Sequence, residues 1–351
     1  MTTVHMVVPE GIDDPRRPSG GNTFDRRVCR GLASEGWTVH VHEVSGSWPQ
    51  PDAAARAALA EVVAGIPDGA VVLLDGLVAS PVPEVLVPEA ARVRLVALVH
   101  MPLGRATVNG ARGREEAVLS AARSVVTTSA WSRQALLELY PLPAARVHVA
   151  HPGVDAAGLA PGTPTAGAFL TVAAVIPGKG HDVLLDALAL LDEPGWQCLC
   201  VGSVDRDPAY AADLRRRVLD RGLGGRVLFV GPQTEAALAR SYQAADLLVL
   251  PSRAETYGMV VTEALARGVP VVATDVGGVP EAMGHGAGVV RPGVLVPPDD
   301  PAVLRDALRA WLRSADLRRR LRRAAQERRE TLADWSSTTA VIADVIVAAA
   351  P

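Results

Sequence analysis

The stretch DLLVLPSRAETYGMVVTEALARGVPVVATD, residues 246–275, decides the fold class of this chain. Its apolar run 246–252 predicts a buried strand, residues 257–267 predict a helix, and the run 270–275 predicts a second strand. Two consecutive strands joined through a helix form a βαβ unit, whose strands are parallel and covered by helices. The stretch therefore predicts an α/β protein.

The same alternation of apolar runs and helical segments continues along the chain. Strands are expected at 4–8, 38–44, 70–75, 94–100, 124–129, 146–150, 169–175, 197–202, 226–231, 246–252, 270–275 and 293–297. Helices are expected at 23–35, 52–65, 131–140, 181–192, 208–221, 234–243, 257–267 and 301–313. This order predicts two doubly wound, Rossmann-like parallel sheets that face a central cleft.

The predicted domain boundary lies in a segment rich in Gly, Pro, Ala and Thr. Residues 1–155 form the expected N-terminal domain, 156–167 the linker, and 168–330 the C-terminal domain. A last helix, 331–351, is expected to pack back toward the N-terminal domain, since VIADVIVAAA is apolar. Ligands of such sheets bind at the carboxyl ends of the strands, so both domains can contribute loops to a site.

Composition and charge indicate an ordinary globular protein. The chain has 351 residues, 49% hydrophobic and 21% charged, with a net charge of −3. This balance gives no sign of a nucleic-acid partner. Residues 305–330 hold ten arginines against four acids. A solvated helical face is the expected interpretation of this segment, and a membrane-surface patch is the alternative.

Neither targeting nor disulfide chemistry is indicated. MTTVHMVVPE lacks the basic segment and the cleavage site of a signal peptide, and every apolar run is shorter than the roughly 20 residues of a membrane span. We therefore expect a cytoplasmic protein. Cys29, Cys198 and Cys200 are too few for a disulfide framework. The last two are expected in a buried strand rather than at a metal.

Lys179 is the only lysine in a chain with 34 arginines. It lies in PGKGHDVLLDAL, after a predicted strand and before a predicted helix. This position places its ammonium group at a carboxyl end of the sheet, where a compact cation suits a phosphate or diphosphate. The alternative is an ordinary surface lysine.

Two glutamates, Glu255 and Glu263, stand eight residues apart in the deciding stretch. Glu255 lies in the loop after a strand, where its carboxylate can contact a polar ligand. Glu263 lies on an otherwise apolar helix, where an unpaired charge is costly and needs a partner, such as ligand hydroxyls. Gly258 precedes that helix, whose first amides form an anion site.

Glycine pairs precede two predicted helices. Gly20 and Gly21 stand just before a helix expected to open near Asn22, and Gly277 and Gly278 form a second turn in DVGGVPE. The first pair does not form the G-x-G-x-x-G pattern of dinucleotide-binding loops, so NAD binding is poorly supported.

These motifs, taken in order, resemble retaining GT-B glycosyltransferases of family 4. The E-x7-E spacing from Glu255 to Glu263 carries the resemblance most specifically. It extends over nearly the whole chain through SGGNTFDRRVCRGLASEGWTVHV, LVH at His100, TTSAWSR, VHVAHPGVD, PGKGHDVLLDAL, VLFVG, YQAADLLVLPS and VLVPPDD.

The resemblance implies a transferase that uses a nucleoside-diphosphate-sugar donor and needs no metal and no other cofactor. Lys179 would contact the donor diphosphate, Glu263 the ribose hydroxyls, and Glu255 the hydroxyls of the transferred hexose or pentose. His100 would reach the sugar from the N-terminal domain. Other donor-binding positions implied by the resemblance are Gly20, Gly21, Arg253, Tyr257 and the backbone amides of Gly258, Met259 and Val260.

The chain departs from the family pattern at three places. Ala174 stands where the family has an arginine that shares the diphosphate charge, and Arg253 is the candidate substitute. His151 stands where asparagine is common, and Thr256 and Tyr257 stand where Gly-Phe is common. The first departure bears on how the donor binds.

Other functions stay open at this point. Ala174 favours a degenerate GT-B protein that binds a sugar nucleotide or a partner without turnover, and a phosphorylase or an epimerase-like GT-B enzyme is a third interpretation. The acceptor is expected to be a small molecule bound by loops 9–22, 45–52, 76–81 and 101–114. Arginines in these loops suggest an anionic acceptor, against the alternative of solvated loops: Arg16, Arg17, Arg105, Arg112 and Arg114.

Overall fold

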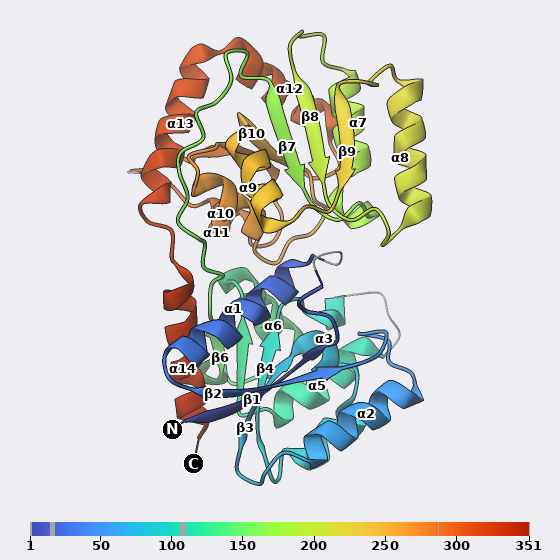
Figure 1. Cartoon of the computed structure of the whole chain (residues 1–351), viewed down its shortest axis with the longest axis vertical. Coiled ribbons are helices and arrows are strands. Elements are labelled where there is room, and N and C mark those ends of the chain that lie inside the picture. Colours follow the sequence, from blue (N-terminus) through green and yellow to red (C-terminus); the bar gives the residue numbers. More distant parts are fainter. Residues whose placement is uncertain (1, 15–17, 106–109, 287, 351) are drawn as a thin grey trace. The chain divides into compact units, whose positions relative to one another are not determined.

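A computed structural model describes residues 2–14, 18–105, 110–286 and 288–350. The chain divides into two compact units. The first unit comprises Met1–Asp14, Gly20–Gly153 and Ala333–Pro351, and the second comprises Pro15–Ser19 and Val154–Leu332. Each unit contains one parallel six-stranded sheet with helices packed against it (Figure 1).

The sheet of the first unit has the strand order β2-β1-β3-β4-β5-β6. Its strands are β1 (Thr3–Pro9), β2 (Thr38–Val44), β3 (Val71–Asp75), β4 (Arg94–Val99), β5 (Ser124–Thr127) and β6 (Val147–Val149). Its helices are α1 (Gly20–Ser34), α2 (Ala53–Ala64), α3 (Gly76–Ala79), α4 (Pro83–Glu89), η1 (Leu103–Arg105), α5 (Ala111–Ala121), α6 (Ala130–Leu139), η2 (Ala144–Arg146) and α14 (Trp335–Ala349).

The sheet of the second unit has the strand order β12-β11-β10-β7-β8-β9. Its strands are β7 (Ala168–Val172), β8 (Gln197–Val201), β9 (Val227–Gly231), β10 (Leu247–Leu250), β11 (Val271–Thr274) and β12 (Gly293–Val296). Its helices are η3 (Pro177–Lys179), α7 (His181–Ala189), α8 (Pro208–Asp220), α9 (Glu235–Gln243), α10 (Met259–Leu265), α11 (Val279–Met283), α12 (Pro301–Arg313) and α13 (Ala315–Arg329).

The predicted α/β fold class is confirmed: each of the twelve predicted strands is present, and all pair in parallel. Cys198 and Cys200 are buried on β8, as expected. Among the described residues, we find no helix of the length and apolarity that crossing a bilayer requires.

The strand order reverses once in each sheet, and these switch points place the loops of interest. In the second unit the reversal lies between β7 and β10, whose carboxyl ends lead to the Lys179 loop and the Glu255 loop. In the first unit it lies between β1 and β3, with β4 next in the sheet and His100 directly after it. Ligands of open α/β sheets bind outside the strand ends at such points.

The connecting segment after residue 154 is held firmly on the second unit. The backbone N–H of Ala160 donates to the carbonyl of Arg267 (2.8 Å), and the N–H of Thr163 donates to Asp246 Oδ1 (2.7 Å). Arg322 donates to the same Asp246 oxygen (2.6 Å). The predicted linker is therefore an anchored segment of the second unit.

The helices after residue 314 belong to different units. Helix α13 lies in the second unit, and several of its arginines bind backbone or acidic groups there, as Arg318 does at the carbonyl of Trp311 (2.7 Å). Helix α14 lies beside α1 in the first unit (Figure 1). The two approach closely, since a Cβ atom added at Gly31 would stand 2.1 Å from Thr339 Oγ1.

Candidate functional site

Lys179 and Glu255 meet at the switch point of the second sheet. Lys179 Nζ lies 2.7 Å from Glu255 Oε1, and the hydroxyl of the buried Ser252 donates to the same oxygen (2.8 Å). The two residues are 76 positions apart in sequence and follow β7 and β10 respectively. Both side chains are partly exposed, at 27% for Lys179 and 13% for Glu255, so a ligand can reach the pair.

Glycines allow the two loops to approach each other. Gly180 has φ +66°, and a Cβ atom there would stand 2.0 Å from the carbonyl oxygen of Pro251. The N–H of Arg253 also donates to the carbonyl of Gly178 (2.9 Å). Since only glycine adopts this conformation in this space without strain, Gly180 fixes where Lys179 stands relative to Glu255.

The second glycine pair supports the Glu255 loop from the other side. Gly277 has φ +55°, and a Cβ atom there would stand 1.7 Å from the carbonyl oxygen of Glu255. The N–H of Gly278 donates to that same oxygen (3.1 Å). The DVGGVPE turn thus holds the backbone of the Glu255 loop through direct contact.

Arg253 links three loops instead of facing a ligand freely. Its guanidinium binds both carboxylate oxygens of Asp182 (3.0 and 2.8 Å) and Asp299 Oδ1 (2.7 Å), and it contacts the carbonyl of Pro177. Although burial alone would raise the pKa of Asp182, hydrogen bonds from Arg253 and Tyr210 lower it to about 2. The Arg253 charge is therefore neutralised within the protein, which weakens the expectation that it replaces the arginine missing at Ala174.

Glu263 has a protein partner, which the apolar surroundings of its helix required. The hydroxyl of Tyr242 donates to Glu263 Oε2 (2.6 Å), and Arg267 lies over the Tyr242 ring, 4.9 Å from its centroid. Tyr242 is buried, and burial followed by the Glu263 charge raises its pKa well above the ordinary value. Tyr242 therefore acts as a neutral donor that fixes the Glu263 carboxylate.

The start of α10 lies between these two glutamates. Gly258 caps the helix in the left-handed conformation, with φ +95°, and Met259 and Val260 form its first turn. Tyr257 is buried just before the cap. The first amides of α10 therefore follow the Glu255 loop directly.

His181, the first residue of α7, is a fully buried imidazole next to the Lys179 loop. Neither ring nitrogen has a hydrogen-bond partner among the described residues, and the ring packs near Phe229, with centroids 6.0 Å apart. Burial lowers the pKa of His181 to about 4, so the folded protein holds it neutral at pH 7.

We expect acid to destabilise the protein through His181. The unfolded chain protonates this ring near pH 6.5, whereas the folded chain does so only near pH 4. The stability due to the neutral ring is complete above pH 6.5 and is lost as the pH falls toward 4, by about 3 kcal/mol. Urea unfolding at pH 7.0 and 4.5 would measure this loss. His181→Leu should show a smaller loss, and equal losses in both proteins would contradict the assignment.

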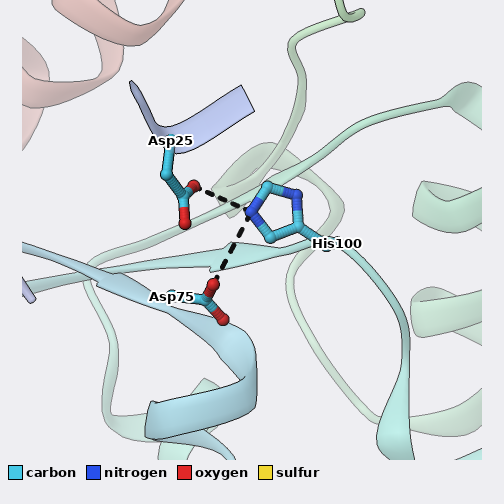
Figure 2. Close-up of side chains that lie close together, drawn as sticks. All are labelled: Asp25, Asp75 and His100. Atoms are coloured by element: carbon cyan, nitrogen blue, oxygen red, sulfur yellow. Dashed lines mark hydrogen bonds and ion pairs between the residues drawn. The ribbon is translucent and has the colours of Figure 1, made fainter. Parts of the chain in front are cut away.

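His100, Asp25 and Asp75 form a second cluster, in the first unit (Figure 2). His100 Nε2 lies 2.8 Å from Asp25 Oδ1 and 3.9 Å from Asp75 Oδ2. Asp25 comes from α1 and Asp75 ends β3, where its Oδ1 accepts from the N–H of Leu77 (2.6 Å). Both aspartates are buried, whereas the His100 side chain is 13% exposed.

The cluster has shifted pKa values. Burial alone would lower the pKa of His100, but the charge of Asp25 and the hydrogen bond to it outweigh burial and raise the pKa to about 9. Burial and the neighbouring Asp25 raise the pKa of Asp75 well above its usual range. These three side chains also have the residue types and the spacing of a metal site, and in this structure His100 pairs with Asp25 through a contact of 2.8 Å.

Gly21 approaches the His100 ring, and the structure corrects one prediction about its loop. A Cβ atom at Gly21 would stand 3.3 Å from His100 Cδ2. Helix α1 begins at Gly20, so the prediction that both glycines precede a helix opening near Asn22 is wrong. The observed contact gives Gly21 a local reason to lack a side chain.

The arginines of the predicted acceptor loops divide into two groups. Arg16 and Arg17 lie outside the described residues. Arg105 lies over the Trp131 ring, 5.0 Å from its centroid, and Arg112 donates to the carbonyl of Leu139 (2.9 Å). At least these two described arginines therefore make contacts within the first unit.

Sequence reasoning singled out His100, Glu263 and Arg253 but missed the residues that bind them. It did not identify Asp25, Asp75, Tyr242 or Asp182. A signal existed for the first two: Asp25 lies on the buried face of α1 with Phe24 and Val28, and Asp75 ends a strand of otherwise apolar residues. Strand ends at one sheet edge bring such residues together.

The comparison with protein families finds a match to residues 164–328, a little under half of the chain. This segment matches the model described as "Glycosyl transferases group 1". D-inositol 3-phosphate glycosyltransferase of Jonesia denitrificans is 34% identical over 246 residues, which cover 64% of this chain and 57% of that protein. The Mycolicibacterium smegmatis protein of the same name is 36% identical over 186 residues, 50% of this chain and 42% of that protein. The chain spans about half the length of the curated relatives it matches.

Solved structures show the same fold across the chain. Sucrose-phosphate synthase from Thermosynechococcus elongatus aligns with a TM-score of 0.79 at 22% identity, covering 99% of each chain. Anabaena HepE, solved in complex with UDP and glucose, aligns with a TM-score of 0.79 at 18% identity, covering 99% of this chain and 100% of that chain. The chain therefore has the GT-B fold of two Rossmann-like domains.

Proposed function

Because residues 164–328 match the family model described as "Glycosyl transferases group 1", we propose that this chain transfers a sugar from a nucleoside-diphosphate-sugar donor to a small-molecule acceptor, with retention of anomeric configuration. One observation carries the proposal: Lys179 and Glu255 converge at the switch point of the sheet in that domain, 2.7 Å apart and accessible. The Lys179 ammonium group there can bind a leaving diphosphate, and the Glu255 carboxylate can accept hydrogen bonds from sugar hydroxyls.

The proposed mechanism is electrostatic and needs no metal ion. Cleavage of the bond between the sugar and the diphosphate leaves negative charge on the departing oxygen. Lys179 neutralises that charge, and the first amides of α10 at Gly258, Met259 and Val260 add donors. Glu263, fixed by Tyr242, accepts from the ribose hydroxyls. When the donor displaces Lys179 from Glu255, the Glu255 carboxylate becomes available to the transferred sugar.

The donor is tested by thermal-shift measurements with UDP, GDP, ADP, dTDP and NAD in a buffer that contains EDTA. A ligand at about 100 times its dissociation constant stabilises a protein by roughly 2.7 kcal/mol, which a melting curve resolves. We expect a shift with one nucleoside diphosphate that is reduced in Lys179→Ala and Glu263→Ala. A shift with NAD alone would contradict the proposed donor class.

The acceptor is proposed to be a small polyol that carries a phosphate. This rests on the relatives, which are named for D-inositol 3-phosphate, and on the presence of Arg16 and Arg17 in the first of the N-terminal loops of the sequence. Transfer assays with the donor that gives a shift would compare D-inositol 3-phosphate with unphosphorylated inositol. Equal rates with both, or undiminished transfer in Arg16→Ala/Arg17→Ala, would count against an anionic acceptor.

A second candidate is a sugar-nucleotide-binding protein without turnover. Ala174 favours it, because the family arginine is absent and Arg253 is already bound by Asp182 and Asp299. A nucleotide shift without transfer to any acceptor and without donor hydrolysis would select this candidate. Slow hydrolysis of the donor by the purified chain would exclude it.

A further inference from the structure

We infer that Asp25 and Asp75 are positioning residues that hold His100 as an imidazolium, with the second ring nitrogen left to donate to a ligand oxygen. The inference rests on the proposed function only in treating that ligand as a substrate. The inference concerns the protonation state of His100, which can be measured without any turnover of substrate.

The Nε2 edge of the His100 ring faces the two buried aspartates (Figure 2). Figure 2 shows Nε2 turned toward both carboxylates, with the other nitrogen on the far side of the ring. Phe24 contacts the ring edge-on, at 5.3 Å between centroids, and Gly21 approaches Cδ2. The ring therefore has little freedom to turn, and Nδ1 has no partner among the described residues.

The charges in the cluster limit how many protons it holds. Two ionised carboxylates this close together in a buried place would repel each other strongly. Asp25 is the nearer anion to His100, at 2.8 Å against 3.9 Å for Asp75. The favoured state therefore pairs a charged His100 with a charged Asp25 and leaves Asp75 protonated, which makes the cluster neutral overall.

The raised pKa values of His100 and Asp75 agree with this proton count. The titratable groups that face His100 among the described residues are Asp25 from α1 and Asp75 from β3. Asp25 Oδ2 is buried without a hydrogen-bond partner there, so it is available as the acceptor for the Asp75 proton. A neutral histidine would offer Nδ1 as a donor in one tautomer only, whereas the imidazolium always donates.

The two aspartates are therefore predicted to be unequal. Asp75→Asn replaces a protonated carboxyl group with a neutral group of the same shape and should keep His100 charged at pH 7.5. Asp25→Asn removes the counter-ion and should raise the acid dissociation constant of His100 at least tenfold. Asp25→Asn/Asp75→Asn should leave His100 neutral at pH 7.5.

Nitrogen-15 NMR of the imidazole groups in the full chain measures this directly. The His100 signals are identified by their absence in His100→Gln, and they are followed from pH 6 to 10. We expect imidazolium shifts at both His100 nitrogens at pH 7.5, and a titration that reflects a pKa of about 9 in the unmodified protein. Neutral-ring shifts at pH 7.5 would overturn the inference, whatever happens in the variants.

The variants test the assignment of roles, with circular dichroism to confirm that each is folded. The inference is overturned if Asp25→Asn leaves the pKa of His100 unchanged. It is also overturned if Asp75→Asn lowers the pKa of His100 as much as Asp25→Asn does. If Asp25→Asn does not fold, the titration of His100 in the unmodified protein and in Asp75→Asn decides whether the inference holds. Since no donor or acceptor is present, failure here is distinct from failure of the proposed glycosyl transfer.

Discussion

Lys179→Ala is expected to lower the turnover of donor 10²–10³-fold, which corresponds to about 3–4 kcal/mol of lost transition-state stabilisation. The reason is the charge that develops on the leaving diphosphate. No second arginine or lysine is positioned to replace it in the described loop, because position 174 is alanine and Arg253 is held by Asp182 and Asp299. Single-turnover kinetics with saturating donor would separate this effect from weaker binding.

The matched control is Lys179→Arg, which keeps the charge but changes its shape. A guanidinium is planar and longer than an ammonium group, and Gly180 and the Pro251 carbonyl leave a fixed space for the loop. We expect Lys179→Arg to recover only part of the rate. Full turnover in Lys179→Ala would show that Lys179 does not neutralise the leaving diphosphate and that another group binds it.

Gly180→Ala is expected to lower the free energy of unfolding by about 2–6 kcal/mol. A non-glycine residue at φ +66° costs roughly 1–3 kcal/mol, and forcing a Cβ atom to within 2.0 Å of the Pro251 carbonyl adds an overpacking cost of about 1–3 kcal/mol. The backbone oxygen belongs to the Glu255 loop and cannot rotate away as a side-chain tip can. Urea denaturation of the purified variant would measure the loss.

The same loop offers an internal control two residues earlier. A Cβ atom added at Gly178 would meet no atom within 4 Å, and the Gly178 backbone lies outside the left-handed region. Gly178→Ala should therefore change stability by less than about 1 kcal/mol. Equal destabilisation by Gly178→Ala and Gly180→Ala would show that the loop is sensitive to any added side chain, and that the close approach to Pro251 is not the cause.

The strands are predictable from sequence because each is a short apolar run bounded by loop-forming residues. Parallel strands buried on both faces carry this pattern strongly. Helices α3, α4 and α5 are absent from the predicted set, and α3, with four residues, is too short to display helical periodicity. The expected start of α1 is too late because glycines normally weaken a helix, whereas here Gly20 opens it.

The candidate site is predictable only where the chemistry is local. Lys179 and Glu255 stand out because each follows a strand that the sequence predicts. The partners of Arg253 and His100 are not predictable, because these contacts join residues far apart in sequence: 71 residues between Arg253 and Asp182, and 75 between His100 and Asp25. Nothing near Arg253 in the sequence shows that its charge is already neutralised, which is why the sequence suggests that it faces the donor.

Helix α14 gives the chain an order of assembly. The core of the first unit includes Ile342, Val345 and Ile346 of α14, packed with Phe24 and Val28 of α1. During synthesis, β1 to β6 emerge first but lack this helix until the entire second unit has been made. Domains tend to fold as they emerge from the ribosome. In this chain the half that is translated first is therefore completed last, because its core lacks the apolar side chains of α14 until the end of translation.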